Sequence, residues 1–162
     1  MKTIEIYGEN YIEQYTKLRE ACRGIVVRDN KILLTYETNT NQWFIPGGGL
    51  ESNESLSQCC IRELAEETGC IVEVDKQYLT INEYYDEVLW VSHYFMCNYV
   101  EKTERTLTQR EYEVGLESRW IPIDEAIKNF SKYQDYADKN KMKSGAYLRE
   151  YKALLEYIGI EI

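Results

Sequence analysis

The chain has 162 residues, a length at which one domain can enclose a hydrophobic core. Its net charge is −9 at pH 7 and no run of lysine or arginine stands out, which argues against broad binding to nucleic-acid backbones or anionic membranes. With 44% hydrophobic and 29% charged residues the composition is that of a globular protein, and we expect a single domain over residues 1–162.

The cysteines and the N-terminal segment indicate a reducing cytoplasm. Five cysteines are an odd number, so a structural disulfide framework is not expected. The N-terminal segment lacks the apolar stretch of a signal peptide, and no apolar run approaches the length of a membrane span. A zinc site is not expected either, because His93 is the sole histidine and there is no Cys-x-x-Cys pair.

Hydrophobic periodicity predicts strands interspersed with three helices. The predicted strands are Thr3–Tyr7, Ala21–Val27, Lys31–Tyr36, Gln42–Ile45, Ile71–Val74, Tyr78–Tyr85, Leu89–Tyr99 and Ser118–Ile121. The predicted helices are Ser55–Thr68, Asp124–Phe130, with Asp124 near its N-cap, and Tyr147–Ile158. Strands mixed with helices in this way favour an α/β layered domain.

The first predicted helix has clear signals at both ends. Ser55 and Gln58 have the spacing of a capping box, in which each side chain binds the other residue's backbone. Gly69 is a good helix terminator because glycine readily adopts the left-handed conformation found there. These signals predict the helix boundaries independently of any tertiary contact.

Three carboxylates of this helix, Glu63, Glu66 and Glu67, fall at i, i+3 and i+4 and therefore crowd one face. Such a cluster alone is more often a solvated helix face. Here, however, Leu56 and Cys60 lie on a mainly apolar stripe that Glu63 and Glu67 continue. Acids on a buried stripe need a partner, and oxygen-only ligands suit Mg²⁺ or Mn²⁺.

The segment that contains this helix resembles the signature of the Nudix hydrolases, G-x5-E-x7-R-E-U-x-E-E-x-G-U, in which U is a bulky aliphatic residue. The residues in register are Gly48, Glu54, Arg62, Glu63, Leu64, Glu66, Glu67 and Gly69. Cys70 stands at the final U position and is the one departure. The resemblance implies a Nudix-type α/β/α sandwich with a central mixed β-sheet.

The resemblance also implies an activity and roles for the motif residues. The implied reaction is Mg²⁺-dependent (or Mn²⁺-dependent) hydrolysis of a diphosphate linkage in a nucleoside diphosphate derivative, such as a nucleoside triphosphate or a dinucleoside polyphosphate. We expect Glu66 and Glu67 to be the principal metal ligands and Glu63 to be the general base or a shared ligand. Glu54 and Arg62 are expected to orient the site by linking the preceding loop to the helix.

Neighbouring residues offer weaker candidates for substrate binding. Gly47 and Gly48 lead to a helix N-terminus, where backbone N–H groups favour phosphate, although three glycines after a strand are ordinarily only a turn. Arg23 has the chemistry to grip a phosphate, although an outward-pointing strand arginine is the more common case. Aromatic side chains that could stack on a base are Trp43, Phe44, Tyr84 and Tyr85.

A downstream loop holds further acids, Glu111, Glu113 and Glu117. In some Nudix enzymes such a loop supplies the general base. Each of these three glutamates could have that role or could equally be an ordinary solvent-exposed charge. The proline that often follows the motif in ADP-ribose hydrolases is absent, and the tyrosine of the dinucleoside polyphosphate hydrolases has a weak counterpart in Tyr84 or Tyr85.

We expect the partner to be a small-molecule nucleotide, with no nucleic acid, no membrane and the question of a homodimer left open. One alternative is a non-catalytic nucleotide-binding or sensing module, although all the motif glutamates are present. Another is an RNA 5′-pyrophosphohydrolase, which the absence of a basic cluster disfavours.

Overall fold

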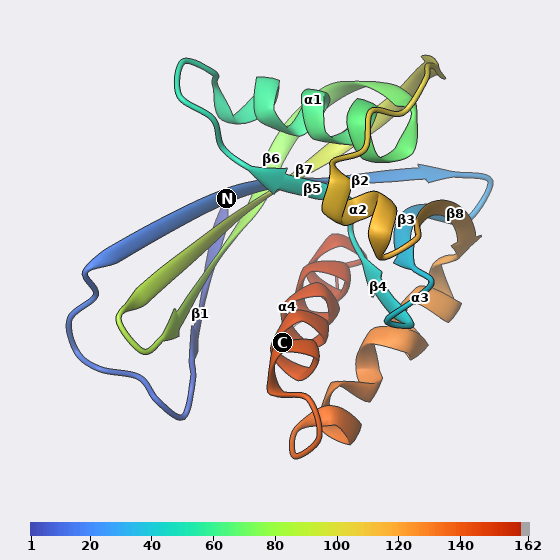
Figure 1. Cartoon of the computed structure of the whole chain (residues 1–162). Coiled ribbons are helices and arrows are strands. Elements are labelled where there is room, and N and C mark those ends of the chain that lie inside the picture. The colour runs from blue at the N-terminus through green and yellow to red at the C-terminus, as the bar shows by residue number, and fades with distance from the viewer. Residues whose placement is uncertain (160–162) are drawn as a thin grey trace.

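The computed structural model describes residues 1–159, in which a mixed sheet lies between helices (Figure 1). The strands are β1 (Lys2–Tyr7), β2 (Lys17–Arg28), β3 (Lys31–Glu37), β4 (Gln42–Phe44), β5 (Gly47–Gly49), β6 (Cys70–Tyr85), β7 (Val88–Lys102) and β8 (Leu116–Pro122). The helices are α1 (Leu56–Thr68), α2 (Gln109–Glu113), α3 (Ile123–Phe130), the 3₁₀ helix η1 (Ser131–Tyr136) and α4 (Lys141–Tyr157).

Strand β2 joins the two parts of the sheet. The strand order is β1-β6-β7-β2-β3-β4, with β5 paired to β2 and β8 paired to β3. The β1–β6 and β2–β7 pairs are parallel and the remaining pairs are antiparallel, so the sheet is mixed. The last residues of β2, Val27 and Arg28, turn the chain into β3 through Asp29 and Asn30, which both have positive φ. The predicted strands Ala21–Val27 and Lys31–Tyr36 are thus confirmed, and they join as an antiparallel hairpin.

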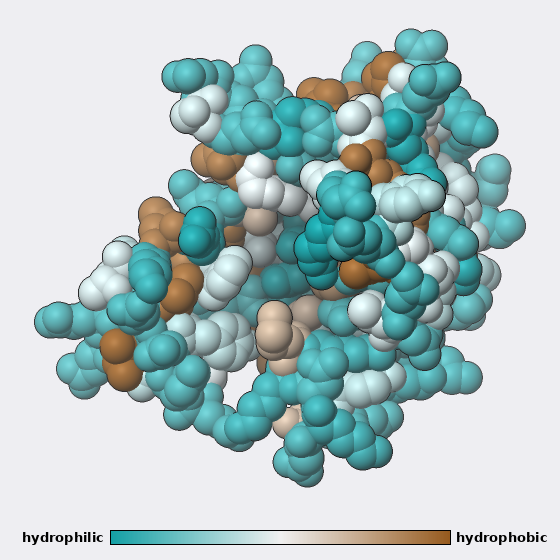
Figure 2. Space-filling model, viewed as in Figure 1, coloured by the Kyte–Doolittle hydropathy of each residue, from teal (hydrophilic) through white to brown (hydrophobic). Residues whose placement is uncertain are grey.

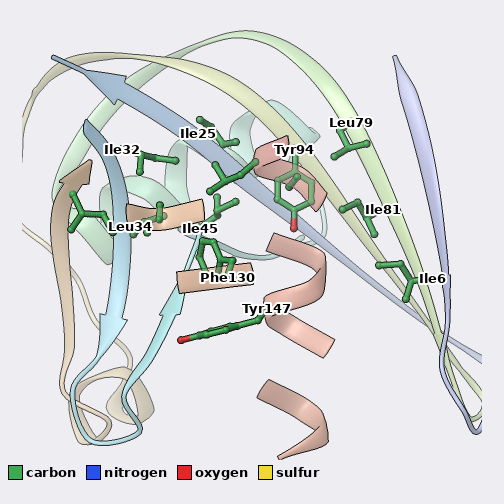
Figure 3. Packing of buried hydrophobic residues seen from close by; sticks show 14 residues of the cluster. Ile6, Ile25, Ile32, Leu34, Ile45, Leu79, Ile81, Tyr94, Phe130 and Tyr147 are labelled. Carbon is green, nitrogen blue, oxygen red and sulfur yellow. The ribbon is translucent and has the colours of Figure 1, made fainter. Parts of the chain in front are cut away.

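Each face of the sheet carries its own hydrophobic core. Helix α1 covers one face, where Leu64 packs with Val26 and Phe95. Helices α3 and α4 cover the other face, and Figure 3 shows Tyr94 pointing from the sheet into the core that it shares with Tyr147 of α4. This arrangement confirms the expected α/β/α architecture with its central mixed sheet.

Several element boundaries differ from prediction. The two strands predicted at 71–74 and 78–85 are one strand, β6, with irregular register around Lys76. The glycines predicted as a turn form β5, which pairs with β2. Asp124 lies near the N-cap as predicted, in the first turn of α3, and the N-cap position itself is occupied by Pro122. Helix α4 begins at Lys141 rather than Tyr147, with the Asn140 side chain as its cap.

The cysteines are all buried free thiols, namely Cys22, Cys59, Cys60, Cys70 and Cys97. They belong to the core beneath α1, where the Sγ atoms of Cys60 and Cys97 lie 3.8 Å apart. Within residues 1–159, no helix combines the length and the apolar character that crossing a membrane requires.

Candidate active site

Helix α1 is anchored by its caps and by one close contact with the sheet. The predicted capping box forms, with Ser55 Oγ accepting the Gln58 N–H at 3.1 Å and Gln58 Oε1 accepting the Ser55 N–H at 2.8 Å. Gly69 ends the helix in the left-handed conformation at φ 68°. At Gly24 of β2, an added Cβ would lie 2.8 Å from a methyl of Leu64, so the helix approaches the strand closely. The face of α1 that bears Leu64 is therefore packed against β2.

Strand β5 lies directly against two of the motif carboxylates. Gly47 pairs with Arg23 of β2, and its N–H donates to Glu67 Oε2 at 3.0 Å. A Cβ on Gly48 would lie 2.5 Å from the carboxyl carbon of Glu63. The absence of a side chain at Gly48 therefore makes room for the Glu63 carboxylate, and Glu63 and Glu67 face the same short strand.

Arg62 binds the loop before α1 to the helix. Its Nε donates to Glu54 Oε2 at 2.9 Å and its Nη2 donates to Glu54 Oε1 at 2.7 Å and to the carbonyl oxygen of Gly49 at 3.0 Å. Its Nη1 donates to Glu63 Oε1 at 2.8 Å and to Glu66 Oε2 at 3.2 Å. The two-pronged contact with Glu54 has the geometry of a strong charge-assisted pair. This is the loop-to-helix link that the resemblance implied.

Burial disfavours the charged forms of Glu63 and Glu67, the two carboxylates that face β5. Withdrawal from water raises the pKa of Glu67 to about 8, and the nearby charge of Glu63 adds to the effect. Burial also raises the pKa of Glu63, against the opposing hydrogen bond from Arg62. A cation placed between these carboxylates would reverse both shifts.

A divalent cation fits the chemistry of this donor set, which is rich in oxygen and short of compensating positive charge. The geometry is less complete than the sequence implied, because no group of three or more His, Cys, Asp or Glu side chains within residues 1–159 is arranged to hold a metal ion. The reason is visible at Arg62, whose guanidinium bridges Glu63 and Glu66, while Glu67 is turned to the Gly47 N–H. The three acids thus share a neighbourhood without converging on one point.

The downstream acids are separated by the structure. Glu111 lies in α2, a helix that the sequence did not reveal, and its charge is among those that raise the pKa of both Glu63 and Glu67. Glu113 instead accepts a hydrogen bond from Gln109, and Glu117 pairs with Arg119 at 2.6 Å. Of these three acids, only Glu111 acts through its charge on the carboxylates of α1, and its Oε1 accepts the Thr108 N–H at 3.1 Å in the cap of α2.

Arg23 is held beside the glycine strand. Its Nη1 donates to the carbonyl oxygen of Ile45 at 3.1 Å, and its positive charge acts to lower the pKa of Glu67. The space-filling view shows the surface hollowed between α1 and α4 (Figure 2). Because Arg23 projects from the sheet face that α4 covers, it lies between this helix and the carboxylates of α1.

The candidate stacking residues are dispersed. Tyr84 stacks on Tyr7 with ring centroids 5.0 Å apart, and its side chain lies on the sheet face opposite to that of Tyr85. Trp43 packs against Tyr36, with centroids 4.4 Å apart. Tyr85 approaches α4, where an added Cβ on Gly145 would lie 2.9 Å from its hydroxyl oxygen. The structure does not bring these rings together into one platform.

A charged residue of α4 next to the site escaped the sequence reasoning. Glu150 is completely buried, although it lies seven residues before Tyr157 in a helix with many charges. Its signal was present, because Tyr147, Glu150 and Leu154 follow i, i+3, i+7 spacing, which places an acid on an apolar stripe. The same argument had singled out Glu63 and Glu67.

The chain matches known proteins in sequence. The model of the NUDIX domain family matches residues 18–142. The chain is 31% identical over 86 residues to an ADP-ribose pyrophosphatase of Methanocaldococcus jannaschii, a match that covers 44% of this chain and 51% of that protein. It is 31% identical over 70 residues to the m7GpppN-mRNA hydrolase of Saccharomyces cerevisiae, a match that covers 40% of this chain and 7% of that protein. The chain thus spans about half the length of the first relative and a small part of the second.

The fold also has solved counterparts. A NUDIX hydrolase from Nitrosomonas europaea superimposes with a TM-score of 0.61 at 22% identity, and the match covers 85% of this chain and 90% of that one. This likeness concerns the fold, which it supports over most of the length. With the family model matching residues 18–142, and with the motif residues held on one helix and its preceding loop, the chain belongs to the Nudix family.

Proposed function

We propose that the chain is a divalent-metal-dependent pyrophosphohydrolase that hydrolyses the diphosphate linkage of a small nucleoside diphosphate derivative. The observation that carries the proposal is the pair of partly buried carboxylates, Glu63 and Glu67, held against the glycine strand β5 with pKa values raised by burial. Buried anions in that position do not stabilise the fold, whereas they can bind a cation that in turn neutralises a phosphate.

The proposed roles follow from the positions of the side chains. Glu66 and Glu67 would hold Mg²⁺ or Mn²⁺, with Glu63 as a shared ligand or as the base. When bound, the metal would supply charge neutralisation for the phosphate oxygens and acidification of water. Arg62 holds the loop and helix in register through Glu54. Its hold on Glu63 and Glu66 would have to loosen for both to serve as ligands.

The reaction itself is a hydrolysis of a phosphoanhydride. A water oxygen forms a bond to phosphorus, the bond between that phosphorus and the bridging oxygen breaks, and the proton of the water passes to a base such as Glu63. Gly47 and Gly48 of β5 and the guanidinium of Arg23 are the groups we assign to the diphosphate. We include ADP-ribose among the candidate substrates, together with nucleoside triphosphates and dinucleoside polyphosphates, because one relative is named as an ADP-ribose pyrophosphatase.

The test is a panel of these nucleotides, incubated with the protein and Mg²⁺ and resolved by chromatography. We expect one class to be cleaved, chelation with EDTA to abolish turnover, and added Mg²⁺ or Mn²⁺ to restore it. Glu67→Gln should lower turnover by about 10²-fold or more while the protein stays folded. Binding of nucleotides without cleavage of any of them would favour the non-catalytic module instead.

A further inference from the structure

A buried carboxylate on α4 reaches across to the segment that carries the glycine strand. Glu150 has no exposed surface, and its Oε2 accepts the backbone N–H of Ile45 at 2.8 Å. Its Oε1 accepts the hydroxyl of Tyr94 at 3.1 Å and the Nε of Arg149 at 2.8 Å. Figure 3 shows the Tyr94 hydroxyl directed from the sheet towards α4. Glu150 therefore connects the C-terminal helix, strand β7 and the chain just before β5.

Arg23 is the second group that Glu150 faces. The Nε of Arg23 lies 3.8 Å from Glu150 Oε1 and is buried without a hydrogen-bond partner. Its Nη1 donates to the carbonyl oxygen of Ile45, the residue whose N–H binds Glu150. One edge of the guanidinium thus faces the carboxylate at ion-pair distance and is hydrogen-bonded to the segment that the carboxylate itself fixes. Within residues 1–159, Nη2 has no hydrogen-bond partner and is not among the buried atoms.

Arg23 also lies near the motif carboxylate Glu67, whose pKa its positive charge acts to lower. Arg23 pairs with Gly47 in the β2–β5 register, and a Cβ on Gly47 would lie 2.9 Å from Arg23 Cγ. The same glycine donates its N–H to Glu67. Arg23 is therefore placed between Glu150 on one side and the candidate metal ligand Glu67 on the other.

A second ion pair balances the charge of Glu150. Arg149, with a side chain 12% exposed, contacts both Glu150 at 2.8 Å and Glu83 at 3.3 Å. The charges alternate in sign along the chain Glu83, Arg149, Glu150 and Arg23. Glu150 therefore has two counter-ions, Arg149 and Arg23. Buried ion pairs of this kind are often no more stabilising than apolar side chains of similar size. Stability alone does not account for such a network beside a candidate active site.

We propose that Glu150 is a positioning residue that presents Arg23 and the Ile45–Gly47 segment to the diphosphate of the substrate. This inference rests on the proposed function. Glu150 itself does not touch the substrate: it holds one edge of the guanidinium, and the opposite edge binds phosphate oxygens. The consequence is that α4, far along the chain from the motif, contributes to substrate affinity.

The experiment is a double-mutant cycle with Arg23→Ala, Glu150→Gln and the double variant. KM and kcat are measured on whichever panel nucleotide the unmodified protein hydrolyses, and ADP binding is measured by calorimetry as a readout without turnover. Glu150→Gln should raise KM about tenfold or more and change kcat less, as expected for lost ground-state binding. In the Arg23→Ala background it should have almost no further effect, because its action passes through Arg23.

Glu83→Gln is the matched control. It also removes a buried carboxylate bound to Arg149, but it leaves Arg23 untouched. KM and the dissociation constant for ADP should therefore remain within about twofold of the original values. Thermal unfolding of each variant sets an assay temperature at which all are folded. Should Glu150→Gln fail to fold, Glu150→Asp keeps the charge, draws it back from Arg23, and should raise KM in the same way.

Failure of the inference about Glu150 and failure of the proposed function give different results. If Glu150→Gln raises KM as much without Arg23 as with it, or if Glu83→Gln raises KM equally, Glu150 has a general structural role and the inference is wrong. If the unmodified protein neither binds ADP nor cleaves any nucleotide of the panel, the proposed function fails first, and the inference falls with it.

Discussion

At the scale of single residues, the adjacent glycines Gly47 and Gly48 of β5 are needed for different reasons. Gly47 has φ +153°, and a Cβ there would lie 2.1 Å from the carbonyl oxygen of Cys22, a backbone atom that cannot move aside cheaply. At Gly48 the nearest atoms belong to the carboxylate of Glu63, the far end of a flexible side chain. One glycine is required by the backbone, and the other by the candidate site.

We therefore predict that Gly47→Ala destabilises the fold by more than about 2 kcal/mol, through steric conflict with the backbone of β2. Gly48→Ala should change stability little, because Glu63 can rotate away, but should lower turnover at least about tenfold, since Glu63 then leaves its position. Chemical denaturation and steady-state kinetics on both variants would check this. A Gly48→Ala variant with unchanged turnover would remove Glu63 from the proposed site.

The Glu54–Arg62 pair predicts a dependence of stability on acidity. The hydrogen bond from Arg62 is the main cause that lowers the pKa of Glu54 from 4.5 to about 2. A carboxyl with a depressed pKa stabilises the fold above its unfolded value of 4.5, and this contribution is lost as the pH falls towards 2. Full conversion of the shift gives an upper limit of about 3 kcal/mol, and solvent screening of the pair brings the expected contribution nearer to about 1 kcal/mol.

Urea unfolding at about pH 6 and about pH 3 would measure the effect. The difference in unfolding free energy between the original chain and Glu54→Gln should be largest at the higher pH and shrink at the lower. Glu51→Gln is the control, because Glu51 is 68% exposed and lies 3.8 Å from Arg62. An equal loss in both variants at each pH would show that Glu54 has no special pairing.

At the scale of elements, the contact between α1 and β2 depends on one missing side chain. An added Cβ at Gly24 would lie 2.8–2.9 Å from both terminal methyl groups of Leu64 and 3.0 Å from the Sγ of Cys60. The helix bearing the three carboxylates is thus seated as close to the sheet as its side chains allow. A substitution here acts on the whole helix rather than on one contact.

Gly24→Ala should cost about 1–3 kcal/mol through overpacking. Because α1 must shift to relieve the crowding, turnover should fall as well, even though the residue touches no candidate ligand. Gly49→Ala is a fitting comparison, since a Cβ there meets nothing within 4 Å. Calorimetric unfolding should separate the two variants, and equal stability would contradict the close seating of α1.

At the scale of the whole molecule, the net charge of −9 bears on the class of substrate. A small nucleotide that carries its own Mg²⁺ arrives with much of its charge neutralised. A long RNA does not, and it would need clustered basic contacts. Salt screens the repulsion over roughly 8–10 Å.

We predict a higher kcat/KM for a soluble nucleoside di- or triphosphate derivative than for a 5′-phosphorylated RNA. Both substrates would be measured at one Mg²⁺ concentration and at two ionic strengths. The gap should narrow as salt increases, because the repulsion of the longer polyanion is screened more strongly. A clear preference for RNA at physiological salt would contradict this prediction.

Much of α1 followed from the sequence because its signals are local. The capping box of Ser55 and Gln58, the terminator Gly69 and the i, i+3, i+4 spacing of the acids need only a helix to take effect. Element types were predicted for the same reason. Helix α2 was missed since it is five residues long, too short for periodicity to register.

What only the tertiary structure decided was which side chains meet across the sheet. The N–H of Gly47 reaches Glu67 because β5 pairs with β2 beneath α1, and Arg23 reaches Glu150 because α4 covers the opposite face. The sequence placed acids on apolar stripes without saying what they face. Spacing along a helix or strand orients neighbours a few residues apart, whereas contacts between distant segments depend on register and layer packing, which no local pattern encodes.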